Sequence, residues 1–170
     1  MLAYADGDSA AFECLYGRHK GKLYAYLSKL CGDRASTDEA FQDTWLRVVD
    51  ARNRYRADAP FGAWLYRIAH RLAIDLLRKR RPQIPVDEVV TELVANDPDP
   101  AHHSMALEDQ QRLIAALDEL PHEQRAAVLM QAHEGMTLEQ IAQVSECGRE
   151  TIKSRLRYAM NRLRASLVKS

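Results

Sequence analysis

The stretch between residues 137 and 167 constrains the fold of this chain more strongly than any other part of the sequence. Thr137 and Gln140 have the spacing of a capping box, in which each side chain satisfies a backbone N–H at the start of a helix. Residues 145–148 are predicted to end that helix in a sharp turn, for which Gly148 can adopt a positive φ. A second helix is predicted to follow from about Arg149, because apolar residues recur there at helical spacing. These residues are Ile152, Leu156, Ala159, Met160 and Leu163.

Two helices joined by a tight turn, with one buried face on the second, form the pattern of a helix-turn-helix. In this motif the second helix enters the major groove of DNA, and its N-terminal residues meet the base edges. The residues predicted to face DNA are Arg149, Glu150, Lys153, Ser154 and Arg157. Residues 145–170 contain seven Lys or Arg and two acidic residues, an excess of positive charge that suits contact with phosphates. An ordinary helical hairpin with a solvated basic face is the alternative.

The charges of the chain are strongly segregated, although they sum to zero over its 170 residues. Residues 61–81 hold six basic residues against one acid, whereas residues 82–120 hold nine acids against one basic residue. The acidic segment also holds four of the six prolines, which is typical of a linker. We therefore expect an all-α chain of two small helical domains, residues 1–82 and 105–170, joined by an acidic, Pro-rich linker at residues 83–104.

The N-terminal domain is predicted to contain three helices. The first covers residues 9–31 and ends at Gly32. The second covers residues 36–51, because Ser36 and Glu39 have the spacing of another capping box.

The third helix, over residues 61–81, is predicted to have a packed side and a basic side. Its apolar stripe consists of Phe61, Trp64, Leu65, Ile68, Leu72 and Leu76. The residues largely off this stripe are Tyr66, Arg67, His70, Arg71, Arg78 and Lys79. The preceding loop, residues 53–60, places Tyr55 between two arginines, where an aromatic ring could stack on an unpaired base. A surface tyrosine without a ligand is the alternative.

The remaining chemistry of the sequence excludes several classes of protein. Cys14, Cys31 and Cys147 lie far apart and form no CxxC pair, so we expect no disulfide framework, no metal site and no cofactor. The first two cysteines are predicted to pack as small apolar residues, and Cys147 to be exposed in the turn. The sequence contains no cluster of carboxylates and no nucleophile–base pair of the kind that an enzyme uses, so we do not expect an enzyme. Without a recognisable signal peptide or membrane-spanning run, we expect no direct membrane insertion and a cytoplasmic location.

Three segments together carry a resemblance to a known family. They are DEAFQDTWLRV (38–48), FGAWLYRIAHRLAIDLLRKRR (61–81) and LDELPHEQRAAVLMQAHEGMTLEQIAQVSECGRETIKSRLRYAMNRLR (117–164). In this order they are similar to the core-polymerase-binding segment, the −10 recognition and melting helix, and the −35-binding domain of bacterial RNA polymerase sigma factors. The chain as a whole resembles the small extracytoplasmic-function (ECF) group, which has only the second and fourth sigma regions.

The resemblance implies a role for each matching position. Contact with the clamp helices of the polymerase β′ subunit would involve Asp38, Gln42, Asp43 and Leu46. Recognition and melting of the −10 element would involve Asn53, Arg54, Tyr55, Arg67, His70 and Arg71. The first three of these lie in the loop that takes a flipped base, and the helix-turn-helix residues would face the −35 major groove. The implied partners are core RNA polymerase, through the β′ clamp helices and the β flap, promoter DNA and an anti-sigma factor.

We therefore predict a non-enzymatic factor that binds core RNA polymerase and directs promoter recognition and DNA melting for transcription initiation. The main alternative is a helix-turn-helix transcriptional regulator with an N-terminal sensor or dimerisation domain, which would bind duplex DNA without polymerase. A further alternative is a module that binds polymerase without starting transcription. Only an assay can distinguish such a module from a sigma factor.

Overall fold

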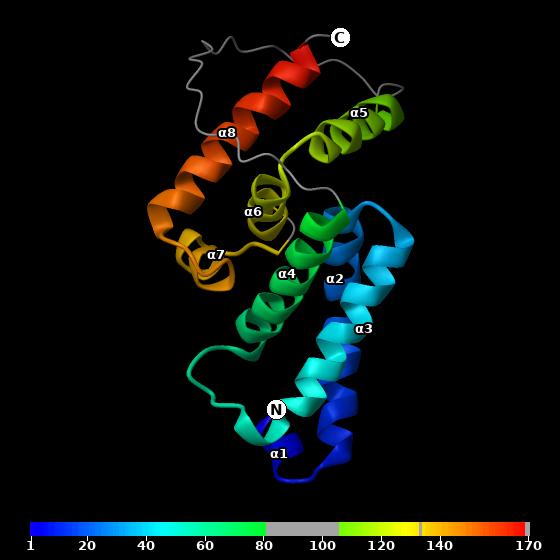
Figure 1. The fold of residues 1–170 in the computed structure, drawn as a ribbon, viewed down its shortest axis with the longest axis vertical. Coiled ribbons are helices and arrows are strands. Elements are labelled where there is room, and N and C mark those ends of the chain that lie inside the picture. The colour runs from blue at the N-terminus through cyan, green and yellow to red at the C-terminus, as the bar shows by residue number, and fades with distance from the viewer. Residues whose placement is uncertain (81–105, 133, 169–170) are drawn as a thin grey trace.

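The structure of the protein, a computed structural model, describes residues 1–80, 106–132 and 134–168 (Figure 1). All regular secondary structure in these ranges is helical, which confirms the predicted all-α fold class. The helices are α1 (Leu2–Ala5), α2 (Ser9–Cys31), α3 (Arg34–Asp50), the 3₁₀ helix η1 (Arg52–Arg54), α4 (Phe61–Arg80), α5 (Ala106–Asp118), α6 (His122–Ala132), α7 (Leu138–Val144) and α8 (Arg149–Val168). The predicted linker at residues 83–104 lies outside the described residues.

Several helix ends follow local signals in the sequence. At the start of α2 the Asp8 carboxylate accepts the N–H of Ala11 at 3.2 Å, and Gly32 ends this helix with a φ of 76°. The capping box at the start of α7 is confirmed: Thr137 N–H donates to Gln140 Oε1 at 2.9 Å, and Gln140 N–H donates to Thr137 Oγ1 at 3.3 Å. Each of these interactions joins residues only three positions apart, which is why the sequence predicts them.

Two local predictions are wrong. Helix α3 begins at Arg34, two residues before the predicted Ser36, because Asp33 caps it instead. The Asp33 carboxylate accepts both the N–H of Ser36 at 2.8 Å and its hydroxyl at 2.7 Å, and Ser36 is buried in the first turn. In the turn before α8, the residue with a positive φ is Glu146, at 52°, and not Gly148.

In the N-terminal half, helices α2, α3 and α4 pack against one another, and α1 lies against α2 and η1 (Figure 1). The fully buried side chains include Leu23, Tyr26 and Leu27 from α2 and Leu65 from α4. Rings at the α2–α3 contact add directional packing, since the Tyr16 and Trp45 rings lie 4.9 Å apart. These three helices therefore form a small bundle in which each helix contacts the other two.

In the C-terminal half, α5, α6 and α7 all pack against the long helix α8. Ile141 and Val144 of α7 are buried together with Ile152 of α8, so the two helices of the helix-turn-helix share apolar contacts. A smaller cluster joins α5 to the far end of α8. Its buried residues are Ala116, Leu120, Ala159 and Leu163.

The two halves also pack against each other. Helix α4 contacts α6 and α7, and α2 contacts α6. One hydrophobic cluster includes Leu27 and Leu65 from the N-terminal half together with Met130 and Ile141 from the C-terminal half. The sequence predicts two separate units, whereas here they share a core. We call this packing of the two halves the closed arrangement.

Candidate nucleic-acid interface

The predicted DNA-facing side of α8 is solvent-accessible. Exposed on it are Arg149, Glu150, Lys153 and Arg157, with Ser154 half-buried. Arg149 Nε lies 2.6 Å from Oε1 of Glu139 on α7, so an ion pair joins the two helices of the motif. Lys153 Nζ lies 3.7 Å from Oε2 of Glu150. Exposed pairs of this kind contribute less than about 1 kcal/mol, so either cation can exchange its carboxylate for a DNA phosphate at small cost.

Two residues of α8 differ from their predicted surroundings. Arg155, counted in the basic cluster, has a side chain only 24% exposed, with Nη1 3.2 Å from Glu123 Oε2 and 3.6 Å from the Cys147 sulfur. Its Nη1 is therefore engaged by residues of the same half of the chain and does not face solvent as a member of the basic cluster. Met160, predicted on the apolar face, is 44% exposed, because its neighbour Ala159 is the one that points into the core.

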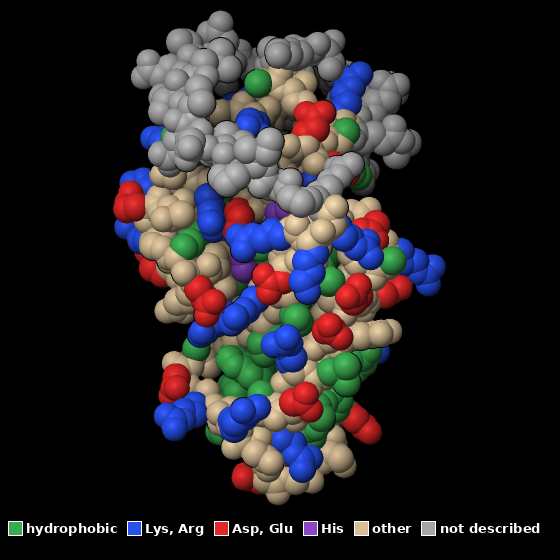
Figure 2. Space-filling model, in the orientation of Figure 1, with side chains coloured by type: hydrophobic (Ala, Val, Ile, Leu, Met, Phe, Trp, Pro, Cys, Tyr) green, Lys and Arg blue, Asp and Glu red, His purple; other side chains and the backbone are tan. Residues whose placement is uncertain are grey.

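The loop that precedes α4 carries an aromatic surface. Tyr55 is half-buried, and its ring lies 5.0 Å from that of Trp64 and 6.2 Å from that of Phe61. Asn53 and Arg54 are exposed in η1 directly before it. Figure 2 shows hydrophobic side chains gathered over the part of the molecule where α3, α4 and their connecting loop lie, with Lys and Arg side chains around them. Such a surface offers rings for base stacking beside cations for phosphates.

The basic side of α4 is only partly open. Arg67 has a half-exposed side chain, but its Nη2 lies 2.5 Å and its Nε 2.8 Å from Oε1 of Glu146, in the helix-turn-helix turn. His70 is 5% exposed, so the structure does not support its predicted place on a DNA-facing surface. The reason is that this side of the helix lies between α2 and the C-terminal half: His70 contacts both Tyr26 of α2 and Glu123 of α6, and the buried Tyr66 ring lies 5.2 Å from that of Tyr26. Arg71 is exposed and forms no ion pair with another described residue.

His70 lies in a polar setting between the halves. Its Nδ1 is 3.2 Å from the Tyr26 hydroxyl, and its Nε2 is 3.8 Å from Glu123 Oε2. Burial lowers the pKa of His70 below its ordinary value of 6.5, although the nearby Glu123 carboxylate opposes this shift. The imidazole is therefore held mainly neutral at pH 7.

Helix α3 presents the residues predicted to bind core polymerase on one face. Leu46 is 60% exposed, an unusual position for a leucine, and Gln42 is exposed one turn before it. Asp43 is half-buried. Asp38 is also half-buried and accepts a hydrogen bond from the Tyr24 hydroxyl at 2.8 Å. An exposed apolar side chain with neighbouring carboxylates suits a protein partner with an apolar and basic surface.

The cysteines depart in part from prediction. Cys31 is buried as expected, whereas Cys14 is exposed on α2. Cys147 is half-buried, and burial raises the pKa of its thiol above the ordinary value. Among the residues that the structure describes, no group of three or more His, Cys, Asp or Glu side chains could hold a metal ion. None of the described helices is both long and apolar enough to span a lipid bilayer.

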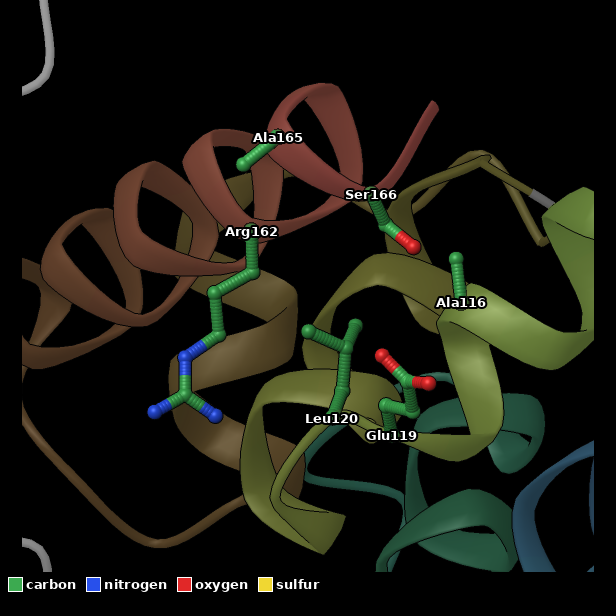
Figure 3. Close-up of a pocket in the computed structure, with 6 residues that line it drawn as sticks. All are labelled: Ala116, Glu119, Leu120, Arg162, Ala165 and Ser166. Carbon is green, nitrogen blue, oxygen red and sulfur yellow. The ribbon is translucent and has the colours of Figure 1, made fainter. Parts of the chain in front are cut away.

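A surface pocket of about 470 Å³ lies between α5 and α8 (Figure 3). Glu119 and Arg162 approach it from opposite sides, with Leu120 between them. On α5 itself, Leu113 and Ile114 are 42% and 51% exposed. This end of the C-terminal half thus offers apolar surface that the rest of the described chain does not cover.

Sequence reasoning missed the acidic residues that join the two halves. Across the boundary, Glu123 on α6 pairs with Arg78, 45 positions away along the chain, and Glu146 in the turn pairs with Arg67, 79 positions away. No local spacing links residues so far apart, so only the folded structure reveals these pairs.

Comparison with known proteins agrees with this arrangement of helices. Residues 15–83 match the Sigma-70 region 2 family, and residues 116–165 match Sigma-70, region 4. The ECF RNA polymerase sigma factor SigE of Mycolicibacterium smegmatis is 33% identical over 97% of this chain, which spans 66% of SigE. The ECF sigma factor SigM of Mycobacterium tuberculosis is 30% identical over 96% of this chain, which spans 80% of SigM.

Two solved structures have the same fold over nearly the whole chain. CnrH, in complex with the cytosolic domain of CnrY, superposes with a TM-score of 0.73 at 25% identity, covering 99% of this chain and 96% of CnrH. RpoE of Bartonella quintana, in complex with the anti-sigma factor NepR, gives a TM-score of 0.70 at 26% identity, covering 92% of this chain and 96% of RpoE.

The fold and the two matched regions define a protein of the sigma-70 class, a promoter-recognition subunit of RNA polymerase and not a catalyst. Within that class, the chain belongs to the ECF family of RNA polymerase sigma factors. The predicted function in transcription initiation is thereby confirmed at the level of the family.

Proposed function

We propose that this chain binds core RNA polymerase and directs it to promoters, with the C-terminal half on duplex DNA and the N-terminal half on a separated strand. The observation that carries the proposal is that an exposed helix-turn-helix and an aromatic, basic loop–helix surface occur in one chain. The domain boundaries that we propose remain residues 1–82 and 105–170, with residues 83–104 between them. Such a factor would act in the cytoplasm.

The −35 element is read by the N-terminal end of α8. The residues proposed for it are Arg149, Glu150, Lys153, Ser154 and Arg157. Arginine can donate two hydrogen bonds to guanine, and glutamate can accept one from cytosine, each worth ~1–3 kcal/mol of discrimination. The exposure of all of them except the half-buried Ser154 supports this role.

The −10 element is held by the loop before α4. A base that leaves the stack loses a few kcal/mol of stacking energy, and contacts to the flipped base offset part of that loss. Tyr55 would stack on it, while Asn53 and Arg54 would contact its edges and backbone. Arg67 and Arg71 of α4 would contact phosphates upstream. His70 is left out of this surface because it is buried.

Core polymerase is bound through α3 and through the C-terminal half. Asp38, Gln42, Asp43 and Leu46 would lie against the β′ clamp helices, and the exposed apolar residues of α5 would lie against the β flap. The related RpoE is crystallised with an anti-sigma factor, which supports an anti-sigma factor as a further partner of this chain.

Run-off transcription tests the proposal directly. Promoter fragments are selected from a random library by the chain together with core polymerase, and transcripts are then measured with and without the chain. We expect transcripts of defined length only when both components are present. Tight, sequence-specific binding to duplex DNA without core polymerase, and no transcript with it, would overturn the proposal.

A further inference from the structure

The loop that joins α3 to α4, residues 51–60, is held by few hydrogen bonds. Its backbone makes two at the start: Ala51 N–H donates to the Arg47 carbonyl at 3.0 Å, and Arg54 N–H donates to the Ala51 carbonyl at 2.9 Å. In the part of the chain that the structure describes, no side chain of this loop forms a hydrogen bond or an ion pair. The position of the loop therefore depends on the packing of its side chains.

Aromatic contacts support the end of this loop. The Tyr55 ring packs against Trp64 and Phe61 of α4, and the Phe61 ring lies 5.2 Å from the His19 ring of α2. Two helices of the N-terminal bundle thus support the ring that is proposed to stack on a base.

A different contact supports the start of the loop, where α1 lies against η1 (Figure 1). The guanidinium carbon of Arg52 lies 5.7 Å from the centroid of the Tyr4 ring in α1, a distance at which the ring attracts the cation. Tyr4 is only 8% exposed, and its ring lies 4.9 Å from that of Phe12 in α2. The Phe12 ring in turn lies 5.9 Å from that of Trp45 in α3. Tyr4 therefore connects η1 to the aromatic residues packed between α2 and α3.

We propose that Tyr4 is a positioning residue for capture of the separated strand, because it holds η1 in place through Arg52. Tyr4 is too deeply buried to offer its own surface to DNA, so it acts through the loop that follows Arg52. A loop that is ordered before its ligand arrives loses less conformational entropy on binding, and the affinity increases accordingly. The inference rests on the proposed function for the role of the loop, but not for the support that α1 gives to it.

Two substitutions of Tyr4 separate the ring from the bulk of the side chain. Tyr4→Leu keeps a large apolar side chain against Phe12 but removes the aromatic face that Arg52 contacts. Tyr4→Phe keeps that face and is the matched control. We expect Tyr4→Leu to weaken binding of the separated strand about two- to fivefold, the range for one exposed contact between a cation and a ring, and Tyr4→Phe to bind as the wild type does.

Fluorescence anisotropy tests this expectation on the full chain with core polymerase. The probe is a labelled single-stranded oligonucleotide that carries the −10 element of a selected promoter, and a −35 duplex is measured in parallel. Tyr4→Leu should weaken binding of the single strand and leave binding of the duplex unchanged, whereas general loss of structure would weaken both. A Tyr4→Leu variant that binds the single strand as tightly as the wild-type chain overturns the proposal.

A double-mutant cycle with Arg52→Gln shows whether Tyr4 acts through Arg52. Arg52 is exposed, so its replacement does not disturb the core. We expect Arg52→Gln to weaken binding of the single strand at least as much as Tyr4→Leu, and Tyr4→Leu to have no further effect in that background. Effects of the two substitutions that multiply would mean that Tyr4 acts independently of Arg52, and they overturn the proposal. Full affinity in Arg52→Gln overturns it even if Tyr4→Leu loses helix content.

Backbone dynamics of the free chain separate this inference from the proposed function. In Tyr4→Leu, the ¹⁵N heteronuclear Overhauser effects of residues 52–55 should fall while those of α4 stay unchanged, and equal values in η1 overturn the proposal. If the wild-type chain transcribes but Tyr4→Leu binds the single strand normally, the positioning role is wrong and the function stands. If the values fall in Tyr4→Leu but the wild-type chain neither binds the strand nor transcribes, the support of the loop by α1 stands and the proposed function is wrong.

Discussion

Lys153→Ala is expected to weaken −35 binding and to reduce its salt dependence. Lys153 is 66% exposed near the start of α8, and its charged partner is Glu150, 3.7 Å away. Because this pair is solvated and weak, the ammonium group can turn to a DNA phosphate without unfolding anything. The substitution should therefore change the free energy of unfolding by less than about 0.5 kcal/mol.

The expected magnitude follows from counterion release. Each phosphate neutralised by a protein cation contributes about −0.9 to the slope of log K against log salt concentration. A fourfold increase in salt, from about 50 to 200 mM, should therefore cost the wild-type chain about 3.5-fold more affinity than Lys153→Ala. The variant is weaker at low salt and approaches the wild type as salt increases.

Fluorescence anisotropy on a selected −35 duplex, with core polymerase present, measures both slopes. Arg164→Ala is the matched control, since Arg164 is an exposed cation eleven residues further along α8, about 16 Å away along the helix axis. Its slope should equal that of the wild type. An unchanged slope for Lys153→Ala would refute the assignment of this residue to a phosphate.

Three further predictions concern core binding, stability and pH. Asp43→Arg reverses a charge on the exposed face of α3 and should lower retention by immobilised core polymerase about tenfold, while circular dichroism shows intact helices; full retention would contradict the α3 assignment. Met130→Ala truncates a fully buried side chain and should lower the free energy of unfolding by about 2–5 kcal/mol, as measured by a denaturant titration. A loss of less than about 1 kcal/mol would mean that the hydrophobic cluster shared by the two halves is loosely packed. Because burial lowers the pKa of His70, the closed arrangement binds fewer protons than a chain whose two halves have separated and left His70 in water. The closed arrangement should therefore be favoured above pH 6.5 and weaken as the pH falls below that value. The groups facing this imidazole are Tyr26, Arg78, Glu123, Glu146 and Arg155. Scattering at pH 7.5 and 5.5 should show expansion at the lower pH, and His70→Gln should remove most of the difference; equal expansion in that variant would assign the effect to the carboxylates.

Much of the secondary structure could be predicted because the signals are local. The predicted helix at residues 9–31 coincides with α2, and α4 and α7 begin where their sequence patterns place them. Apolar residues at helical spacing and short-range caps act within one or two turns, so a linear sequence contains all the information they need. The helix-turn-helix and its exposed basic face follow from the same reasoning.

Prediction from local spacing fails where two neighbouring residues can both cap the same helix. Asp33 and Ser36 can both cap a helix, and the sequence favours Ser36 because of its spacing to Glu39. In the fold, Asp33 accepts two hydrogen bonds from Ser36 and also pairs with Arg80, with Nη1 3.2 Å from Oδ1. That last contact comes from the end of α4, so a distant element supports the choice of cap.

The sequence by itself determined most of the long helices, the capping box of α7, the helix-turn-helix and the resemblance to sigma factors, because each depends on residue types at short and regular spacing. Only the tertiary structure decided which side of α4 is open. His70 and Tyr66 lie off the apolar stripe, which predicts a surface position, yet they are buried because both pack against Tyr26 of α2 and His70 also lies against Glu123 of α6. Arg155, counted from the sequence among the basic residues that suit DNA, likewise pairs with the carboxylate of Glu123, 32 residues away along the chain. Burial depends on what the rest of the chain places against a face, and no pattern within a single helix records that.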